Sequence, residues 1–117
     1  MLTPRQYADY INQEIDAIKY PESPRGLYAP IAYTLDCGGK RLRPMLLMAA
    51  AEALGTDRTK VVSQALGIEM FHNFTLLHDD VMDRADLRRG KPTVHKKWDE
   101  STAILSGDAM LTMSAQL

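Results

Sequence analysis

Three aspartates stand close together in a segment that is otherwise apolar. The stretch LLHDDVMD covers residues 76–83 and contains Asp79, Asp80 and Asp83. On a helix these side chains are three or four residues apart and therefore neighbours, so their charges repel one another. A divalent cation would offset that repulsion, and Mg²⁺ accepts one or two protein carboxylates beside water and phosphate oxygens. A solvated acidic helix face is the alternative, but the apolar surroundings favour a metal.

Two basic clusters are suited to phosphate. GGKRLRP, residues 38–44, brings Lys40, Arg41 and Arg43 into one short loop behind two glycines, and Arg88 and Arg89 form the second cluster. Such side chains hold a diphosphate through charge-assisted, partly bidentate hydrogen bonds. The loop is not a Walker A motif, because the spacing and the Ser/Thr of that motif are absent. Taken alone, either cluster could equally be a solvated basic turn.

His72 lies seven residues before Asp79. Seven steps of about 100° return to within ~20° of the starting direction, so the two side chains share a helix face. A lone helical histidine is usually a packed core residue, but this placement favours a donor to diphosphate. The sequence thus combines acids that suit a metal with cations that suit phosphate, in an apolar helical setting. This combination predicts a site for a diphosphate ester with an apolar tail.

The elements that must position these residues are helices, because apolar residues recur at helical spacing and no strand alternation is clear. Thr3, Pro4 and Gln6 predict the start of the first helix through a capping box and a proline at N1. Further helices are expected over residues 27–36, from Pro44 to just before Gly55, over 59–83 and over 102–117. In the longest one, the predicted stripe is Ala65, Ile68, His72, Thr75, Asp79 and Met82 or Asp83.

The composition limits the class of protein. The chain has 117 residues, 45% of them hydrophobic and 25% charged, and a formal net charge of −1. These values are typical of a soluble globular domain and give no support to nucleic-acid or membrane-surface binding. Cys37 is the only cysteine, which excludes an intrachain disulfide, and no apolar stretch approaches the ~20 residues of a membrane span. We expect a cytoplasmic protein.

Four motifs, in this order and spacing, resemble those of the trans-isoprenyl diphosphate synthases. They are GGKRLRP (38–44), EMFH (69–72), DDVMD (79–83) and DLRRGKPTVH (86–95), and the resemblance extends from Leu27 onward. It implies an all-α fold, the N-terminal part of the isoprenoid synthase helical bundle, usually as a homodimer. It also implies condensation of an allylic prenyl diphosphate with isopentenyl diphosphate in a deep apolar cavity.

The resemblance assigns roles to individual residues. Asp79 and Asp83 match the acids that bind Mg²⁺ at the allylic diphosphate, with Asp80 between them. Lys40, Arg43 and His72 match residues that hold isopentenyl diphosphate, and Arg41 belongs to the same substrate-binding loop. Arg88 matches an arginine on the allylic diphosphate and Arg89 one on isopentenyl diphosphate. Bulky residues before the aspartates set product length in this family, so Phe71, Phe74 and Thr75 suggest a medium-chain product.

Members of this family also carry a second aspartate-rich motif, which these residues lack. We therefore expect residues 1–117 to be a single N-terminal portion of the domain that is inactive alone. Two other functions stay open: a non-catalytic synthase-like interaction subunit and a class I terpene cyclase. DDVMD and both arginines argue against a pure scaffold, and the two basic clusters argue against a cyclase, which has no isopentenyl diphosphate to hold.

Overall fold

The first helix, α1 (Pro4–Asp16), begins at the predicted capping box. In this computed structural model, which describes all of residues 1–117, Gln6 N donates to Thr3 Oγ1 and Thr3 N donates to Gln6 Oε1. Tyr7, Ile11 and Ile15 then repeat at helical spacing and form the buried face of the helix. Both the helix start and its apolar stripe are confirmed.

The next two helices begin slightly earlier than the sequence predicts. Helix α2 covers Arg25–Asp36 and buries Ile31 and Leu35, as expected. Helix α3 covers Leu42–Ala53, so Pro44 is its third residue rather than its first. Proline is tolerated there because the first-turn N–H groups of a helix have no intrahelical acceptor. Gly55, just beyond α3, has φ +89°, the left-handed conformation expected after a helix end.

The longest helix, α4 (Val62–Asp83), carries most of the candidate site residues. Its predicted end is confirmed, but it begins later than Thr59. A separate 3₁₀ turn, η1 (Arg58–Lys60), comes first because Asp57 Oδ1 accepts a hydrogen bond from Thr59 N at 2.8 Å.

The face of α4 that packs inward differs from the predicted stripe. The buried residues are Ala65, Leu66, Gly67, Glu69, Met70, Asn73, Leu77 and Asp80. Of the predicted stripe only Ala65 is among them, whereas Ile68 is 40% and Met82 73% exposed. The stripe through His72 and Asp79 is the open face of α4, because the other helices pack on the opposite side of this helix.

A small hairpin follows α4 and departs from the purely helical expectation. Strands β1 (Leu87–Arg88) and β2 (Lys91–Pro92) pair antiparallel around Arg89 and Gly90, which have φ of +52° and +78°. Helices α5 (Val94–Lys97) and α6 (Glu100–Gln116) complete the chain. Tyr33 on α2 contacts both the hairpin and the segment after α5. Its hydroxyl donates to Pro92 O at 2.8 Å, and its ring packs edge-on against that of Trp98, with 5.3 Å between the ring centres.

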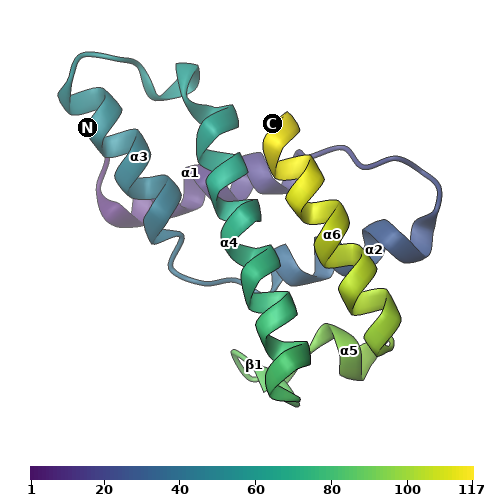
Figure 1. The fold of residues 1–117 in the computed structure, drawn as a ribbon. Helices are drawn as coiled ribbons and strands as arrows, with labels where there is room; N and C mark the ends of the chain where they lie inside the picture. Colours follow the sequence, from purple (N-terminus) through teal and green to yellow (C-terminus); the bar gives the residue numbers. More distant parts are fainter.

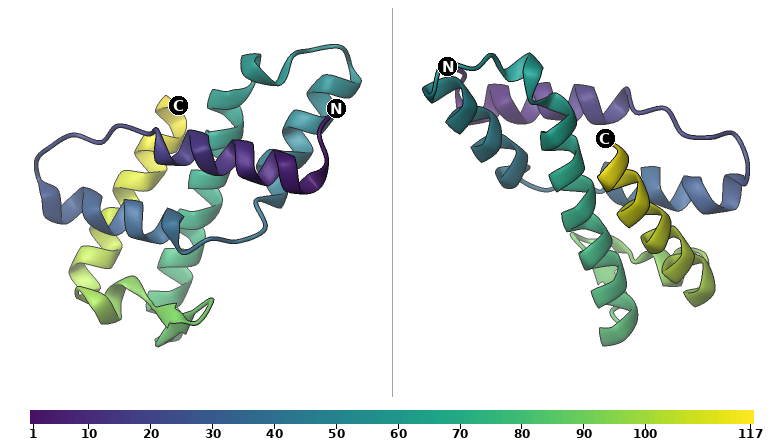
Figure 2. Two further views of the ribbon diagram at one scale, coloured as in Figure 1. Left: turned by 180° about the vertical axis from the view of Figure 1, so that it is seen from behind. Right: turned by 45° about the horizontal axis from the view of Figure 1, so that its top comes forward.

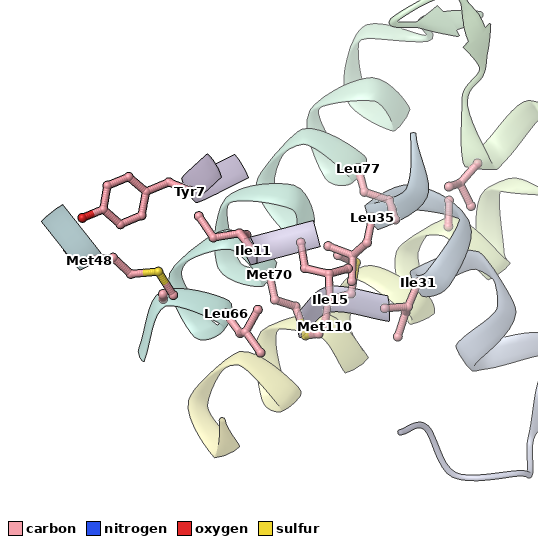
Figure 3. Packing of buried hydrophobic residues seen from close by; sticks show 13 residues of the cluster. Tyr7, Ile11, Ile15, Ile31, Leu35, Met48, Leu66, Met70, Leu77 and Met110 are labelled. Atoms are coloured by element: carbon pink, nitrogen blue, oxygen red, sulfur yellow. The ribbon is translucent and has the colours of Figure 1, made fainter. Parts of the chain in front are cut away.

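Helices α4 and α6 lie side by side, with α1 and α2 crossing behind them (Figures 1 and 2). The close approach depends on glycine, since a Cβ on Gly67 would lie 2.9 Å from Ser114 O and one on Gly107 would overlap the His78 ring. Figure 3 shows the core between these layers, where Ile11, Ile15 and Met70 converge with residues of α2 and α6. None of the helices combines the length and apolarity that crossing a membrane requires.

Candidate functional site

The three aspartates at the end of α4 have different surroundings. Asp79 and Asp83 are exposed and make no hydrogen bond or ion pair within the chain. Asp80 is only 6% exposed, and its carboxylate accepts hydrogen bonds from Arg88 Nε at 2.8 Å and Arg88 Nη2 at 2.7 Å. Only Asp79 and Asp83 thus have free carboxylates, and they are one helical turn apart on the open face of α4.

This pair fits Mg²⁺ better than a metal that needs a closed protein cage. No group of three or more His, Cys, Asp or Glu side chains is arranged to hold an ion. Mg²⁺ is typically held by one or two carboxylates and takes its remaining ligands from water and phosphate. Asp79 and Asp83 supply the two carboxylates, unpaired and open to solvent.

Arg88 is oriented by Asp80. The bidentate hydrogen bonds to Asp80, followed by the charges of Asp79 and Asp83, raise the pKa of Arg88 above its usual value. The guanidinium is half-buried, and its Nη1 makes no hydrogen bond within the chain. The ion pair therefore fastens the hairpin to the end of α4 and leaves one edge of Arg88 beside the free carboxylates.

The residues predicted to hold a second diphosphate meet in one pocket. This basic pocket is lined by Gly39, Lys40, Arg41, Leu42, Arg43, Glu69, His72 and Arg89. It joins the GGKRLRP loop and α4 with Arg89 of the hairpin, whereas Arg88 of the second basic cluster is paired with Asp80. Lys40 is exposed and has no partner, which leaves its ammonium free for an anion.

Arg43 and His72 form one wall of the basic pocket. Arg43 Nη1 lies 3.2 Å from His72 Nε2. Partial burial and the charge of Arg43 lower the pKa of His72, which favours the neutral ring. A neutral ring that accepts from Arg43 through Nε2 carries its proton on Nδ1, so His72 can still donate one hydrogen bond.

Arg89 reaches the pocket across the glycines of the loop. Its Nη1 donates to Gly38 O at 2.7 Å. A Cβ on Gly39, whose φ is +121°, would lie 2.9 Å from Arg89 Nη2. Glycine adopts this φ without strain, and the missing Cβ leaves room for the guanidinium of the hairpin arginine close to the loop.

Arg41 does not share the open position of its neighbours. Its side chain is 3% exposed; Nε donates to Asn12 Oδ1 at 2.9 Å and Nη1 lies 3.3 Å from Glu69 Oε1. Nη2 donates to Leu35 O. The predicted contact of Arg41 with substrate thus gains no support from the geometry, because the guanidinium is already engaged on three sides.

Sequence reasoning missed Glu69 and Asn73. Asn73 Nδ2 donates to Glu69 Oε1 at 2.9 Å, beneath the pocket. EMFH contained the signal, because Glu69 lies three residues before His72 and is therefore its neighbour on a helix. A buried acid so close to several cations predicts an internal ion pair.

The three residues predicted to govern product length lie one to two turns below Asp79. Phe71 is 49% exposed, and Phe74 is half-buried with its ring edge-on to those of Phe71 and His78 at 5.0 and 5.4 Å. Thr75 is half-buried, and its hydroxyl donates to His72 O. Phe71 is therefore the aromatic side chain most open on this part of α4.

Comparison with known proteins gives consistent matches. The chain is 44% identical to the geranylgeranyl diphosphate synthase of Methanosarcina mazei over 110 residues, which cover 94% of this chain and 34% of that protein. It is 50% identical to the farnesyl diphosphate synthase of Geobacillus stearothermophilus over 98 residues, 82% of this chain and 33% of that protein. The chain thus spans about a third of the length of these relatives.

Solved structures agree. The crystal structure of a geranylgeranyl pyrophosphate synthase superposes with a TM-score of 0.95 and 51% identity, over 99% of this chain and 36% of that one. The geranylgeranyl pyrophosphate synthetase of Geoglobus acetivorans gives a TM-score of 0.91 and 42% identity, over 96% and 37%. The sequence model of the polyprenyl synthetase family matches residues 24–117, and the chain belongs to that family.

Proposed function

We propose that this chain supplies one wall of a prenyltransferase site that joins an allylic diphosphate to isopentenyl diphosphate. The observation that carries the proposal is the arrangement on α4. Asp79 and Asp83 lie on the same open face as His72, which lines the basic pocket. The seven residue steps from His72 to Asp79 span about 10 Å of helix, enough to keep two diphosphates apart.

Each diphosphate has its own set of residues in this proposal. Asp79 and Asp83 hold Mg²⁺ at the allylic diphosphate, with the free edge of Arg88 beside them. The basic pocket holds isopentenyl diphosphate through Lys40, Arg43, His72 and Arg89. Separate sites are needed because both substrates carry the same head group but react at different atoms.

The reaction begins when the bond between the allylic carbon and its diphosphate oxygen breaks. When bound, Mg²⁺ supplies Lewis-acid stabilisation of the departing diphosphate. Arg88 stabilises the same developing charge from the protein side. The alkene of isopentenyl diphosphate then attacks the allylic cation, a proton is lost, and the chain is five carbons longer. The cation must be kept from water, and α4 contributes apolar side chains such as Phe71 and Phe74 to the surface that would enclose it.

The similar proteins named as geranylgeranyl and farnesyl diphosphate synthases support a medium-chain product. Phe71 lies about 12 Å and Phe74 about 7 Å below Asp79 along the helix. A prenyl chain that runs from the aspartates down α4 would meet these rings and Thr75. We propose that Phe71, the most open of the three, limits its length most.

Residues 1–117 bring one aspartate pair to the site, and the relatives are about three times as long. We therefore propose that these residues bind diphosphates but do not complete chain elongation by themselves, and that the protein works as a homodimer. An interaction subunit without substrate is less well supported, since Asp79, Asp83 and Lys40 are all free of internal partners.

Calorimetric titration of the chain with geranyl diphosphate, with and without MgCl₂, tests the proposal. We expect Mg²⁺ to strengthen binding at least tenfold, about 1.4 kcal/mol, and Asp79→Asn/Asp83→Asn to abolish that gain. Asp9→Asn, an exposed acid on α1, is the matched control. An affinity for geranyl diphosphate that changes neither with Mg²⁺ nor with the double substitution would refute the metal assignment. Consumption of the allylic substrate without isopentenyl diphosphate would indicate a cyclase instead.

A further inference from the structure

Glu69 creates an electrostatic problem for the basic pocket. Its carboxylate lines the pocket, yet it is only 4% exposed. A buried carboxylate at this place would repel an incoming diphosphate and compete with it for Lys40 and Arg43. Anion binding therefore requires that the charge of Glu69 be neutralised from inside the protein.

Arg41 has the position to do so. It approaches Glu69 from the buried side at 3.3 Å, while its other nitrogens bond Asn12 on α1 and the carbonyl of Leu35 on α2. Its backbone adopts the left-handed conformation, φ +54°, which is unfavourable for a residue with a Cβ. The side-chain bonds must offset that cost, so they also fix the loop between Lys40 and Arg43.

We propose that Arg41 is a positioning residue that neutralises Glu69 beneath the basic pocket, and not a ligand of the diphosphate. This inference rests on the proposed function of the pocket as a diphosphate site. It separates Arg41 from Lys40 and Arg43, which the sequence places in the same loop.

A double-substitution cycle read out by calorimetric titration with inorganic pyrophosphate decides between the two roles. In Arg41→Gln, the carboxylate of Glu69 pairs with the pocket's own cations, and we expect pyrophosphate affinity to fall about tenfold or more. In Arg41→Gln/Glu69→Gln the competing charge is gone, and affinity should return to within about threefold of wild type. A ligand role predicts that the double variant stays as weak as Arg41→Gln, and that outcome would overturn the proposal.

Two controls protect this comparison. Arg5→Gln removes an exposed arginine of α1 that has no partner, and it should leave pyrophosphate affinity unchanged. Arg41→Gln leaves a buried carboxylate unpaired and could unfold the chain, whereas the double variant leaves no buried charge unpaired. If the single variant is unfolded by circular dichroism, the double variant compared with wild type decides alone.

A second measurement needs no ligand. The charge of Glu69 raises and that of Arg43 lowers the pKa of His72. NMR titration should therefore show a higher His72 pKa in Arg41→Gln and a value near wild type in the double variant. An unchanged His72 pKa in a folded Arg41→Gln would overturn the neutralising role. A wild-type chain that fails to bind pyrophosphate would instead refute the proposed function of the pocket, and the NMR result would still decide the role of Arg41.

Discussion

Adjacent aspartates in one motif do different work. Asp79 faces solvent, whereas Asp80, rotated by about 100° on the helix, turns inward and receives two hydrogen bonds from Arg88. Sequence reasoning treated the three acids as one cluster because spacing shows which side chains are neighbours, not which of them meets a distant arginine. The division of labour thus depends on the hairpin, which brings Arg88 back to the helix.

Asp80→Asn should destabilise the chain, whereas Asp79→Asn should not. Loss of the charged hydrogen bonds leaves a half-buried Arg88 poorly paired, and we expect the free energy of unfolding to fall by about 1–3 kcal/mol. Asp79 has no internal partner, so its substitution should stay within about 0.5 kcal/mol. Urea unfolding measures both. Equal effects of the two variants would contradict the assignment of Asp80 as the structural acid.

His72 should make stability depend on pH. Partial burial and Arg43 lower its pKa in the folded chain below the ordinary value of 6.5. The unfolded chain then binds more protons as the pH falls through this range, so His72 reduces stability on the acid side of about 6.5. As the pH falls from about 7.5 to about 5.5, the stability of His72→Gln should therefore rise relative to that of wild type. A difference between the two proteins that does not change with pH would exclude this effect.

Among the elements, the crossing of α4 and α6 sets the tightest constraint. His78 on α4 fits over Gly107 on α6, where its Nε2 lies 3.1 Å from Ile104 O and 3.6 Å from Asp108 Oδ1. Neither His78 nor Gly107 stood out in the sequence, since the importance of each depends on its packing contact with the other across the two helices. The crossing matters for the site because α4 carries the aspartates.

Gly107→Ala should weaken this crossing. The added methyl overlaps the His78 ring, and we expect a loss of about 1–3 kcal/mol in the free energy of unfolding. Gly26→Ala in α2 is the matched control: a Cβ there meets nothing within 4 Å, and stability should stay equal or rise by up to about 1 kcal/mol. Adding His78→Ala to Gly107→Ala should restore much of the loss. Thermal unfolding measures the stability of each variant. If Gly107→Ala is as stable as wild type, the two helices can separate slightly without a cost in free energy.

The helices themselves were largely predictable, but their partners were not. Local signals such as the capping box at Thr3 and the stripe through Ile31 and Leu35 act within one element, and the structure confirms them. The sequence did not show which face of α4 packs inward, because apolar and polar residues occur all around this helix. The hairpin of residues 87–92 is too short to show strand alternation, and the Arg41–Glu69 pair joins segments 28 residues apart.

The molecule as a whole is a flat body with extents of 45 × 28 × 19 Å. Its radius of gyration is 14.6 Å, slightly above the ~13 Å expected for a compact domain of this length. Only 24 of the 117 residues are buried, so much apolar surface stays open. On α6, Ile104, Leu105 and Leu111 are 40%, 58% and 42% exposed. We propose that part of this surface lies in the homodimer interface.

Leu105→Gln/Leu111→Gln should weaken self-association. Replacing two apolar contacts by polar side chains should raise the dimer dissociation constant at least tenfold, about 1.4 kcal/mol. Leu54→Gln, at an 86% exposed position beyond α3, is the control for general loss of surface apolarity. Light scattering over a concentration series measures the dimer fraction. A dimer that both variants leave intact would place its interface elsewhere.

The contact between Tyr33 and Trp98 has a practical consequence. Trp98 is the only tryptophan of the chain, and it lies partly buried against α2, beside the segment that carries Arg88 and Arg89. Lys97 Nζ lies 5.5 Å from the centre of the Trp98 ring, which gives the indole a charged neighbour as well. Its fluorescence is therefore a built-in optical reporter: emission shifts to the red when the hairpin region leaves α2, without any added label.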